Sequence, residues 1–358
     1  MAEVNMEQLL NCALCPNMCR CECPVVQVLG REATAPAGKA RLALMLEQGH
    51  LTWNEEILEA VSNCLGCRGC ATLCPFPELN LCDELLNTRL KSKEAGIGLP
   101  ACDPYLGNLK KFGSPYGQKT GTWPTANKGA EVLLFAGCTS TANNPASIGA
   151  ACHLLDKAGV TYQLIDEDCC GYPAEVWGDE DLARQLAAEN KRKMTESGAS
   201  LLVTNCPECW LTFTEHYPEW NQEIPIQIID GPSYYLQLIR EGRLELKENG
   251  LIAISYHDPC IWARVAKKVT EPREILRAIP GLNIEEPYSS GEATRCCGGG
   301  SMFQLSFPQT AAAVAQRRLA EFPKDTAIVT ACPFCREGLL QEGKPVLELV
   351  ELLAKSVK

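Results

Sequence analysis

The sequence predicts an α/β protein with an α-helical N-terminal domain, followed by a duplicated α/β domain. Three observations lead to this prediction. Helical periodicity dominates up to about residue 100, short apolar runs alternate with helical stretches after residue 130, and one cysteine pattern occurs twice in that later region. The predicted domains are residues 1–100, a linker over 101–129, a first repeat over 130–248 and a second repeat over 249–358.

The N-terminal region has the residue spacing of helices. In residues 38–49, Leu42, Met45 and Leu46 recur at helical intervals, and the segment ends in glycine. Residues 55–61 continue this pattern up to the next cysteines. The stretch 99–129 is rich in proline and glycine and has little periodicity, so we interpret it as the linker.

The region after residue 130 contains one unit twice. Strand-like runs at 132–135, 162–165 and 201–205 alternate with helical stretches at 145–158 and 181–195. The second copy repeats this order, and its cysteines follow their counterparts by 122 residues at Cys260, 127 at Cys296 and 126 at Cys332. Such alternation predicts parallel strands, with each cysteine group just beyond the carboxyl end of a strand, where open α/β sheets bind ligands.

Cysteine is the unusual component of this chain, with 22 of 358 residues. Small secreted proteins reach such a density because they lack a core, but a chain of this length with 46% hydrophobic residues has no such need. The N-terminal segment MAEVNMEQLL has neither the basic nor the apolar part of a secretory signal. We therefore expect metal ligands in a reducing cytoplasm.

Charge and hydropathy exclude two classes of partner. The net charge of −11 disfavours nucleic acid, whose phosphates an acidic surface repels. No apolar run approaches the roughly 18 residues that a membrane span needs.

Two cysteine runs in the N-terminal region have the spacing of iron–sulfur ligands. Each run holds four closely spaced cysteines and ends in Cys-Pro, and in two-cluster ferredoxins the cysteine before proline binds the other cluster. By that pattern, one [4Fe–4S] cubane takes Cys12, Cys15, Cys19 and Cys74, and the other takes Cys64, Cys67, Cys70 and Cys23. Structural zinc is the alternative, but zinc usually binds two cysteine pairs per site. Cys21 lies inside the first run and is a second candidate for the positions of Cys19 or Cys23.

Each copy of the later repeat carries five cysteines in the pattern Cys…Cys-Cys-Gly…Cys-Pro-x-Cys. The first set is Cys138, Cys169, Cys170, Cys206 and Cys209, and the second is Cys260, Cys296, Cys297, Cys332 and Cys335. Five thiolates exceed the four that a cubane takes, so the pattern indicates a larger or less regular cluster. We interpret the glycine as a residue that lets the backbone approach inorganic sulfur. A thioredoxin-like CPxC motif would leave three cysteines of each copy unexplained.

These motifs resemble the CCG-domain proteins, which include the catalytic subunit of heterodisulfide reductase. The segments that carry the resemblance are LFAGCTSTANNPASIGAACHLLDKAGV, DEDCCGYPAEVWG and VTNCPEC in the first copy, and YHDPC, EPREILRAIPG, CCGGGSMF and VTACPFC in the second. With the cysteine runs before them, the chain is similar to the D-subunit form of heterodisulfide reductase. It is equally similar, through GREATAPAGKARLAL, to the iron–sulfur subunits of glycolate, lactate and glycerol-3-phosphate dehydrogenases.

The resemblance implies that each five-cysteine set holds a non-cubane [4Fe–4S] cluster, and that such paired clusters can split a disulfide. Where the family has a His-Leu-Gly-Arg stretch after YHDPC, this chain has Ile261, Trp262, Ala263 and Arg264. We expect Trp262 to place a bulky ring beside Cys260 and to hinder substrate entry. His257 is a candidate proton donor, with a structural hydrogen bond as the alternative. Cys82, Cys102 and Cys152 fall outside every ligand set.

Two functions remain open from the sequence, both of an iron–sulfur oxidoreductase. The first is a relay subunit that carries electrons between a flavoprotein partner and an acceptor. The second is a heterodisulfide reductase-like enzyme that reduces or forms a thiol disulfide. No flavin-binding fingerprint is present, so we expect a flavoprotein partner in a hetero-oligomer: an FAD-linked dehydrogenase, an electron-transfer flavoprotein or a heterodisulfide reductase flavoprotein subunit. The expected location is the cytoplasm, or the inner membrane periphery through that partner.

Overall fold

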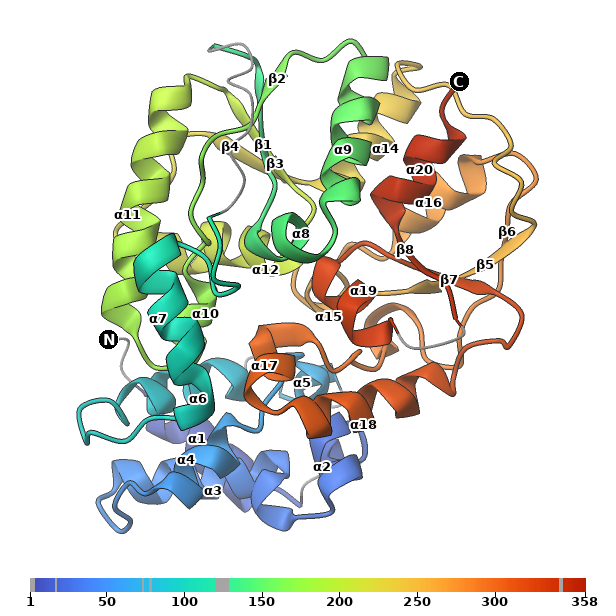
Figure 1. Ribbon diagram of the computed structural model, residues 1–358. Helices are drawn as coiled ribbons and strands as arrows, with labels where there is room; N and C mark the ends of the chain where they lie inside the picture. The colour runs from blue at the N-terminus through green and yellow to red at the C-terminus, as the bar shows by residue number, and fades with distance from the viewer. Residues whose placement is uncertain (1–3, 17, 73, 77–78, 120–128, 341–343) are drawn as a thin grey trace.

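The computed structural model describes residues 4–16, 18–72, 74–76, 79–119, 129–340 and 344–358. Its N-terminal part is helical, as expected, and forms the lower layer in Figure 1. The main helices there are α1 (Met6–Leu14), α2 (Pro24–Leu29), α3 (Pro36–Glu47), α4 (Glu55–Ser62), α5 (Gly69–Thr72) and α6 (Leu81–Leu90).

Local sequence explains where these helices begin. The side chain of Asn5 accepts hydrogen bonds from the first turn of α1, and Asn54 caps α4 in the same way. Helices α2 and α3 both start at a proline, which is favourable at the first helical position because the nitrogen there needs no partner. Leu9, Leu58 and Leu85 are among the buried residues that form a core between α1, α3, α4 and α6.

The first repeat is built on a parallel four-stranded sheet with the order β2-β1-β3-β4. The strands are β1 (Val132–Phe135), β2 (Tyr162–Gln163), β3 (Leu201–Thr204) and β4 (Gln227–Asp230). The helices are α8 (Cys138–Asn143), α9 (Pro145–Lys157), α10 (Tyr172–Val176), α11 (Glu180–Ser197), α12 (Pro207–Leu211), α13 (Tyr217–Glu219) and α14 (Gly231–Arg240). Strand β4 was not expected from the sequence, and neither was its counterpart β8 (Val346–Glu348) in the second repeat.

The second repeat has the equivalent strand order, β6-β5-β7-β8, again fully parallel. Its strands are β5 (Ala253–His257), β6 (Asn283–Ile284), β7 (Ala327–Thr330) and β8 (Val346–Glu348). Its helices are α15 (Cys260–Arg264), α16 (Thr270–Ala278), α17 (Phe303–Ser306), α18 (Pro308–Leu319), α19 (Pro333–Leu339) and α20 (Leu349–Ser356). The matching orders confirm the predicted duplication.

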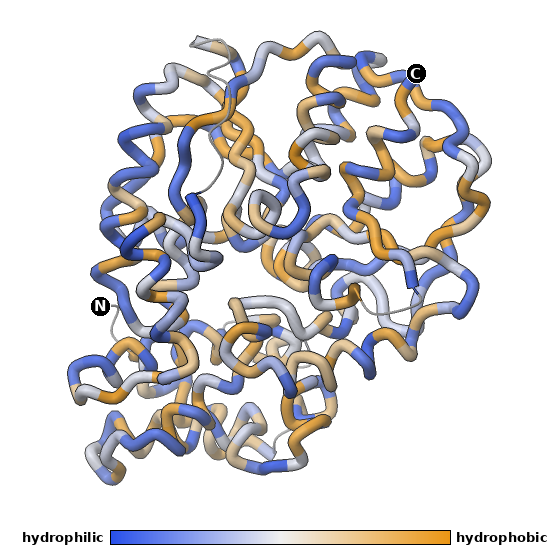
Figure 2. Tube along the Cα trace, viewed as in Figure 1, coloured by the Kyte–Doolittle hydropathy of each residue, from blue (hydrophilic) through white to orange (hydrophobic). Residues whose placement is uncertain are grey.

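The cysteines of the repeats follow the strands, as the alternation of strands and helices predicted. Cys138 begins α8 three residues after the end of β1, and Cys260 begins α15 in the same position after β5. The Cys-Pro-x-Cys segments start α12 after β3 and α19 after β7. In Figure 2 the strands are mainly hydrophobic, and their side chains are largely buried. The five-cysteine sets of the two repeats therefore lie at the carboxyl edges of the two sheets.

The segment expected to be a linker contains a helix, α7 (Asp103–Phe112). Tyr105 on α7 stacks on Trp177 with ring centroids 5.7 Å apart. The carbonyl of Gly113, at the end of α7, accepts a 2.7 Å hydrogen bond from the backbone N–H of Cys169. This part of the segment thus packs on the first repeat, while residues 120–128 lie outside the described residues.

The glycines after the two cysteine pairs allow close helix packing. Gly171 has φ +100° and Gly298 has φ +86°, in the left-handed region that glycine favours. A Cβ atom on Gly171 would lie 2.9 Å from the carbonyl oxygen of Ala183 in α11, and one on Gly298 would lie 2.5 Å from that of Ala311 in α18. These contacts give a different reason for the glycines from the approach to inorganic sulfur that the sequence suggested.

Replacing Gly298 with alanine should destabilise the fold strongly, because a left-handed alanine costs about 1–3 kcal/mol and its methyl group would also collide with α18. The measurement is the free energy of urea unfolding. Gly242→Ala is the matched control: Gly242 has φ +72° but no atom within 4 Å of its Cβ position, so only the backbone cost applies. Equal losses in both variants would show that the close approach of α18 is unimportant.

Candidate functional site: four groups of thiols

The first N-terminal cysteine group surrounds a cavity of about 160 Å³. The cavity is lined by the expected set Cys12, Cys15, Cys19 and Cys74, together with Cys70. Burial and neighbouring thiols raise the pKa of Cys12 to about 11 and that of Cys19 to about 12. Thiolates placed this close repel one another, so the site favours a cation that binds several of them at once.

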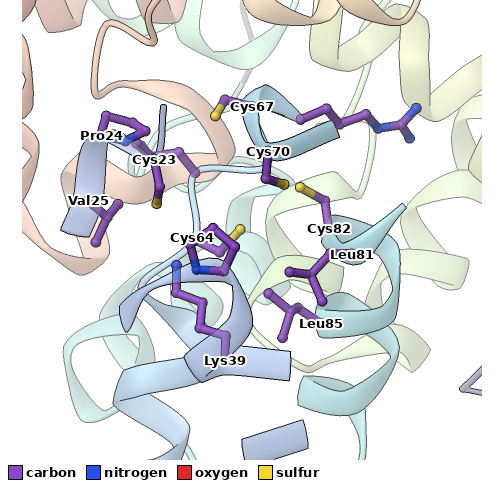
Figure 3. Close-up of a pocket in the computed structure, with 13 residues that line it drawn as sticks. Cys23, Pro24, Val25, Lys39, Cys64, Cys67, Cys70, Leu81, Cys82 and Leu85 are labelled. Atoms are coloured by element: carbon purple, nitrogen blue, oxygen red, sulfur yellow. The ribbon is translucent and has the colours of Figure 1, made fainter. Parts of the chain in front are cut away.

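The second group lines a smaller cavity of about 30 Å³, shown in Figure 3. The structure brings the expected set Cys23, Cys64, Cys67 and Cys70 together there. Each Cys-Pro cysteine thus lies with the other run, as the crossed pattern requires. Cys70 lines both cavities, so the two sites are neighbours.

Lys39 gives the second cavity a buried positive charge. This lysine is only 2% exposed and lines the cavity, where its charge lowers the pKa of Cys23 against the larger, opposite effect of burial. A buried ammonium group is costly unless a negative group compensates it. An iron–sulfur cluster held by four thiolates is negative, so the donor set and its surroundings fit such a cluster.

The first repeat brings all five of its cysteines to one place, lining a cavity of about 10 Å³. The Sγ atoms of Cys138 and Cys169 are 3.6 Å apart. Hydrogen bonds from the thiols of Cys169 and Cys209 lower the pKa of Cys170 well below its usual value. Cys170 is therefore the thiol of this group that most readily becomes a thiolate.

The second repeat brings its five cysteines together in an equivalent arrangement. Cys297 and Cys335 have Sγ atoms 3.3 Å apart, and the backbone N–H of Cys335 donates to the sulfur of Cys332 at 3.4 Å. Cys296 is hydrogen-bonded to Cys260 and to Cys297. The pKa of Cys297 is lowered well below normal by the thiols of Cys296 and Cys335, which matches the position of Cys170 in the first repeat.

His257 ends β5 and lies against this second group. A nitrogen of its ring and the sulfurs of Cys297 and Cys335 lie within 4.8 Å of one another. Arg318 donates from Nε to Nδ1 of His257 at 3.2 Å, so a neutral ring carries its proton on Nε2. Burial lowers the pKa of His257. Among the described residues Nε2 has no hydrogen-bond partner, so its N–H is available to whatever this thiol group binds, and the proton donor considered from the sequence stays a prediction.

The structure corrects the expectation for Trp262. Its indole is fully buried, donates from Nε1 to the carbonyl of Ala331 at 2.7 Å, and packs edge-on against Trp210. Trp262 belongs to the core with Tyr256 and Val329, whereas Cys260 belongs to the core that contains the other cysteines. A helical residue two positions from Cys260 points to the opposite side, so the ring does not hinder access to that sulfur.

The second N-terminal site and the second repeat meet at two sulfur atoms. The thiol of Cys67 interacts with that of Cys296, and this interaction is the main cause that lowers the pKa of Cys67 to about 6. Arg264 bridges the same boundary by donating to the carbonyl of Cys67 at 2.7 Å and to that of Thr294. This contact places one thiol site directly beside another.

Glu208 is a buried group that the sequence reasoning did not select. It lies between the two cysteines of CPEC, and its carboxylate accepts a 2.5 Å hydrogen bond from the backbone N–H of Ser301 in the second repeat. Burial raises the pKa of Glu208 to about 8. The only feature of the sequence that could have indicated a role for Glu208 is its position inside the CPEC motif, where the second copy has Phe334.

The remaining cysteines divide into two kinds. Cys21 is exposed and bonds to the carbonyl of Met18, Cys102 is hydrogen-bonded to Ser306, and Cys152 is hydrogen-bonded to Tyr162. Cys82, which the sequence placed outside every site, instead lines the second cavity. Cys82 is the second residue of α6, which brings it to the cavity. The spacing of the cysteines in the sequence did not predict this position.

Comparison with known proteins matches two domains. The cysteine-rich CCG domain matches twice, over residues 132–214 and 254–339, and the 4Fe-4S dicluster domain matches residues 8–77. These matches confirm the predicted domain types and the duplication.

Curated relatives match large parts of this chain. The D-subunit of dihydromethanophenazine:CoB–CoM heterodisulfide reductase from Methanosarcina barkeri is 28% identical over 85% of this chain and 79% of its own length. The B-subunit of fumarate reductase (CoM/CoB) from Methanothermobacter marburgensis is 27% identical over 82% of this chain and 61% of its own. EtfAB:quinone oxidoreductase from Syntrophomonas wolfei is 27% identical over 66% of this chain and 35% of its own length.

Among solved structures, a hypothetical protein from Helicobacter pylori is similar with a TM-score of 0.57 and 12% identity, covering 88% of this chain and 67% of that chain. This likeness concerns the fold alone. Among the described residues, no helix has the length and apolar character required to cross a membrane.

The substitutions Cys74→Ser and Cys23→Ser distinguish the two N-terminal sites experimentally. Because Cys74 lines only the larger cavity and Cys23 only the smaller, each variant should disturb one electron paramagnetic resonance (EPR) signal of the reduced protein and leave the other. Cys21→Ser is the control and should change neither signal, since Cys21 is exposed and outside both linings. Survival of both signals in both variants would contradict the crossed arrangement.

Proposed function

Because the chain belongs to the CCG-domain iron–sulfur oxidoreductases, we propose that it relays electrons between a flavoprotein partner and an acceptor. In this proposal two [4Fe–4S] cubanes occupy the N-terminal sites. One is bound by Cys12, Cys15, Cys19 and Cys74, and the other by Cys23, Cys64, Cys67 and Cys70. Each five-cysteine set binds a non-cubane [4Fe–4S] cluster.

The observation that supports the relay most is the contact of Cys67 with Cys296. Electron tunnelling weakens steeply with distance, so a relay needs each redox centre close to the next. Cys70 adjoins both N-terminal cavities, and Cys67 meets the second repeat. Pro333 and Phe334 of the second repeat line the cavity of the first, so the series continues there.

The clusters supply one-electron chemistry, and the protein sets their environment. Lys39 contributes a positive charge at the second N-terminal site, and the ring of His257 lies beside Cys297 and lowers the pKa of that thiol. Both stabilise added negative charge, so they favour the reduced state of the adjacent group. The lowered pKa values of Cys170 and Cys297 favour thiolates for binding iron.

The proposed partner is a flavoprotein in a hetero-oligomer. The sequence carries no flavin-binding fingerprint, and the name of the Syntrophomonas relative refers to an electron-transfer flavoprotein. A cytoplasmic position, or one at the membrane periphery through this partner, agrees with thiols that must stay reduced.

Anaerobically purified protein should contain about sixteen irons per chain, with equal acid-labile sulfide, because four sites of four irons are proposed. Metal analysis and sulfide assay test this directly. A measured content of about eight irons per chain would support only the two N-terminal clusters and contradict the clusters in the two repeats. If the purified protein contained mainly zinc, the proposed function would be wrong.

One observation favours the alternative, a disulfide-cleaving enzyme. A cavity of about 260 Å³ reaches Cys296 and is lined by Arg295, Arg317 and Arg318, with Glu321 as its carboxylate. Arg295 and Arg318 both pair with Glu321, which leaves Arg317 bonded to the neutral Gln27. The cavity could take a small anionic thiol or disulfide, and Trp262 does not obstruct it.

The relay predicts that a reduced flavoprotein partner reduces the chain, and that viologen-reduced protein does not cleave a small anionic disulfide. An enzyme would cleave it, and transfer of a single electron from the reduced protein would give a new EPR signal, because one sulfur of the disulfide takes up a proton and leaves as a thiol while the other stays bound to an iron. Arg317→Ala should abolish that signal, whereas Arg192→Ala, an exposed control on α11, should not. A strong signal in the unmodified protein that depends on Arg317 would overturn the relay.

A further inference from the structure

The second N-terminal cavity contains one thiol more than a cubane needs. Cys23, Cys64, Cys67, Cys70 and Cys82 all line it. A four-iron cubane takes one thiolate at each iron, so one of the five sulfurs is in excess. Buried cysteine commonly serves as a small apolar residue, but such a role does not require sulfur neighbours.

Cys82 is held within the cysteine group by its helix. It is the second residue of α6, and Leu81 and Leu85 from the same helix line the cavity beside it. The thiol of Cys82 interacts with those of Cys64 and Cys70, which line the same cavity. In Figure 3 the sulfurs of Cys70 and Cys82 point toward each other.

Cys67 occupies a different position within the same cavity. Its thiol interacts with Cys296, outside the N-terminal domain, and its carbonyl accepts a 2.7 Å hydrogen bond from Arg264. In Figure 3 Cys67 lies near the top, apart from the pair formed by Cys70 and Cys82. The two motif cysteines on either side of Cys67 in the sequence, Cys64 and Cys70, therefore both adjoin Cys82, while Cys67 adjoins the second repeat.

We propose that Cys82 is a fifth thiol ligand of this site, able to bind iron in place of Cys67. The inference rests on the proposed cluster in this cavity. In the exchange, the S–H bond of Cys82 breaks and an S–Fe bond forms. The Fe–S bond of Cys67 breaks, and its sulfur takes up the proton. No electron is gained or lost, so the exchange needs no oxidant or reductant.

The exchange gives the boundary with the second repeat a function. With Cys67 bound to iron, the sulfur of Cys67 connects the cluster to Cys296 in the second repeat. With Cys82 bound instead, Cys67 is a free thiol at Cys296 and the cluster is held wholly by the N-terminal domain. The choice between Cys67 and Cys82 as ligand thus sets the electronic coupling between the second N-terminal site and the thiol group of the second repeat.

Three variants test the proposal: Cys67→Ala, Cys82→Ala and the double variant, with Cys152→Ala as the control because Cys152 lies on α9, outside the site. The readouts are iron and acid-labile sulfide per chain and EPR of the oxidised protein. A cubane that lacks a thiolate readily loses one iron, and the resulting three-iron cluster is paramagnetic when oxidised.

Cys67→Ala should keep the iron content of the unmodified protein and show no three-iron signal, because Cys82 completes the site. The double variant should show that signal or lose up to about four irons per chain. Cluster loss in Cys82→Ala with retention in Cys67→Ala would make Cys82 the resident ligand and also supports the proposal.

A three-iron signal or iron loss in Cys67→Ala alone overturns the proposal. If the double variant does not accumulate, this single variant decides the question by its EPR spectrum. Unmodified protein without a cluster in this cavity would instead contradict the proposed function, so the two failures are distinguishable.

Discussion

Buried thiols in close groups are the constraint on which this structure depends. As thiolates they repel one another, and as neutral thiols they satisfy each other only by weak hydrogen bonds. The opposite shifts within one group illustrate this: the pKa of Cys297 falls well below normal, whereas that of its neighbour Cys296 rises well above it. Such groups are stable in a fold that either binds metal there or holds the sulfurs by rigid packing.

The rigid packing comes from the two sheets and the helices on them. Each cysteine pair precedes a left-handed glycine, and the backbone of α11 or α18 lies directly against that glycine. The pair is thereby fixed between the carboxyl edge of the sheet and a long helix. The same arrangement in both repeats explains why the equivalent thiols, Cys170 and Cys297, have the same direction of pKa shift.

The three parts of the chain meet at a small polar junction. The hydroxyl of Ser301 lies 3.1 Å from that of Tyr172 and donates to the carbonyl of Leu65 at 3.2 Å, while its N–H bonds to Glu208. Ser301 has φ +52°, a conformation that costs energy for a residue with a side chain. These hydrogen bonds offset that cost, and they keep the thiol sites of all three parts close to one another.

The sequence by itself determined the helical and α/β parts, the duplication and the grouping of the cysteines. Those features follow from local periodicity and from motif spacing, which are properties of short segments. Only the tertiary structure decided the place of Cys82, the contact of Cys67 with Cys296, the core position of Trp262 and the burial of Glu208. Each depends on packing between segments far apart in the chain: the proximity of Cys67 to Cys296, for example, joins positions that no local pattern relates.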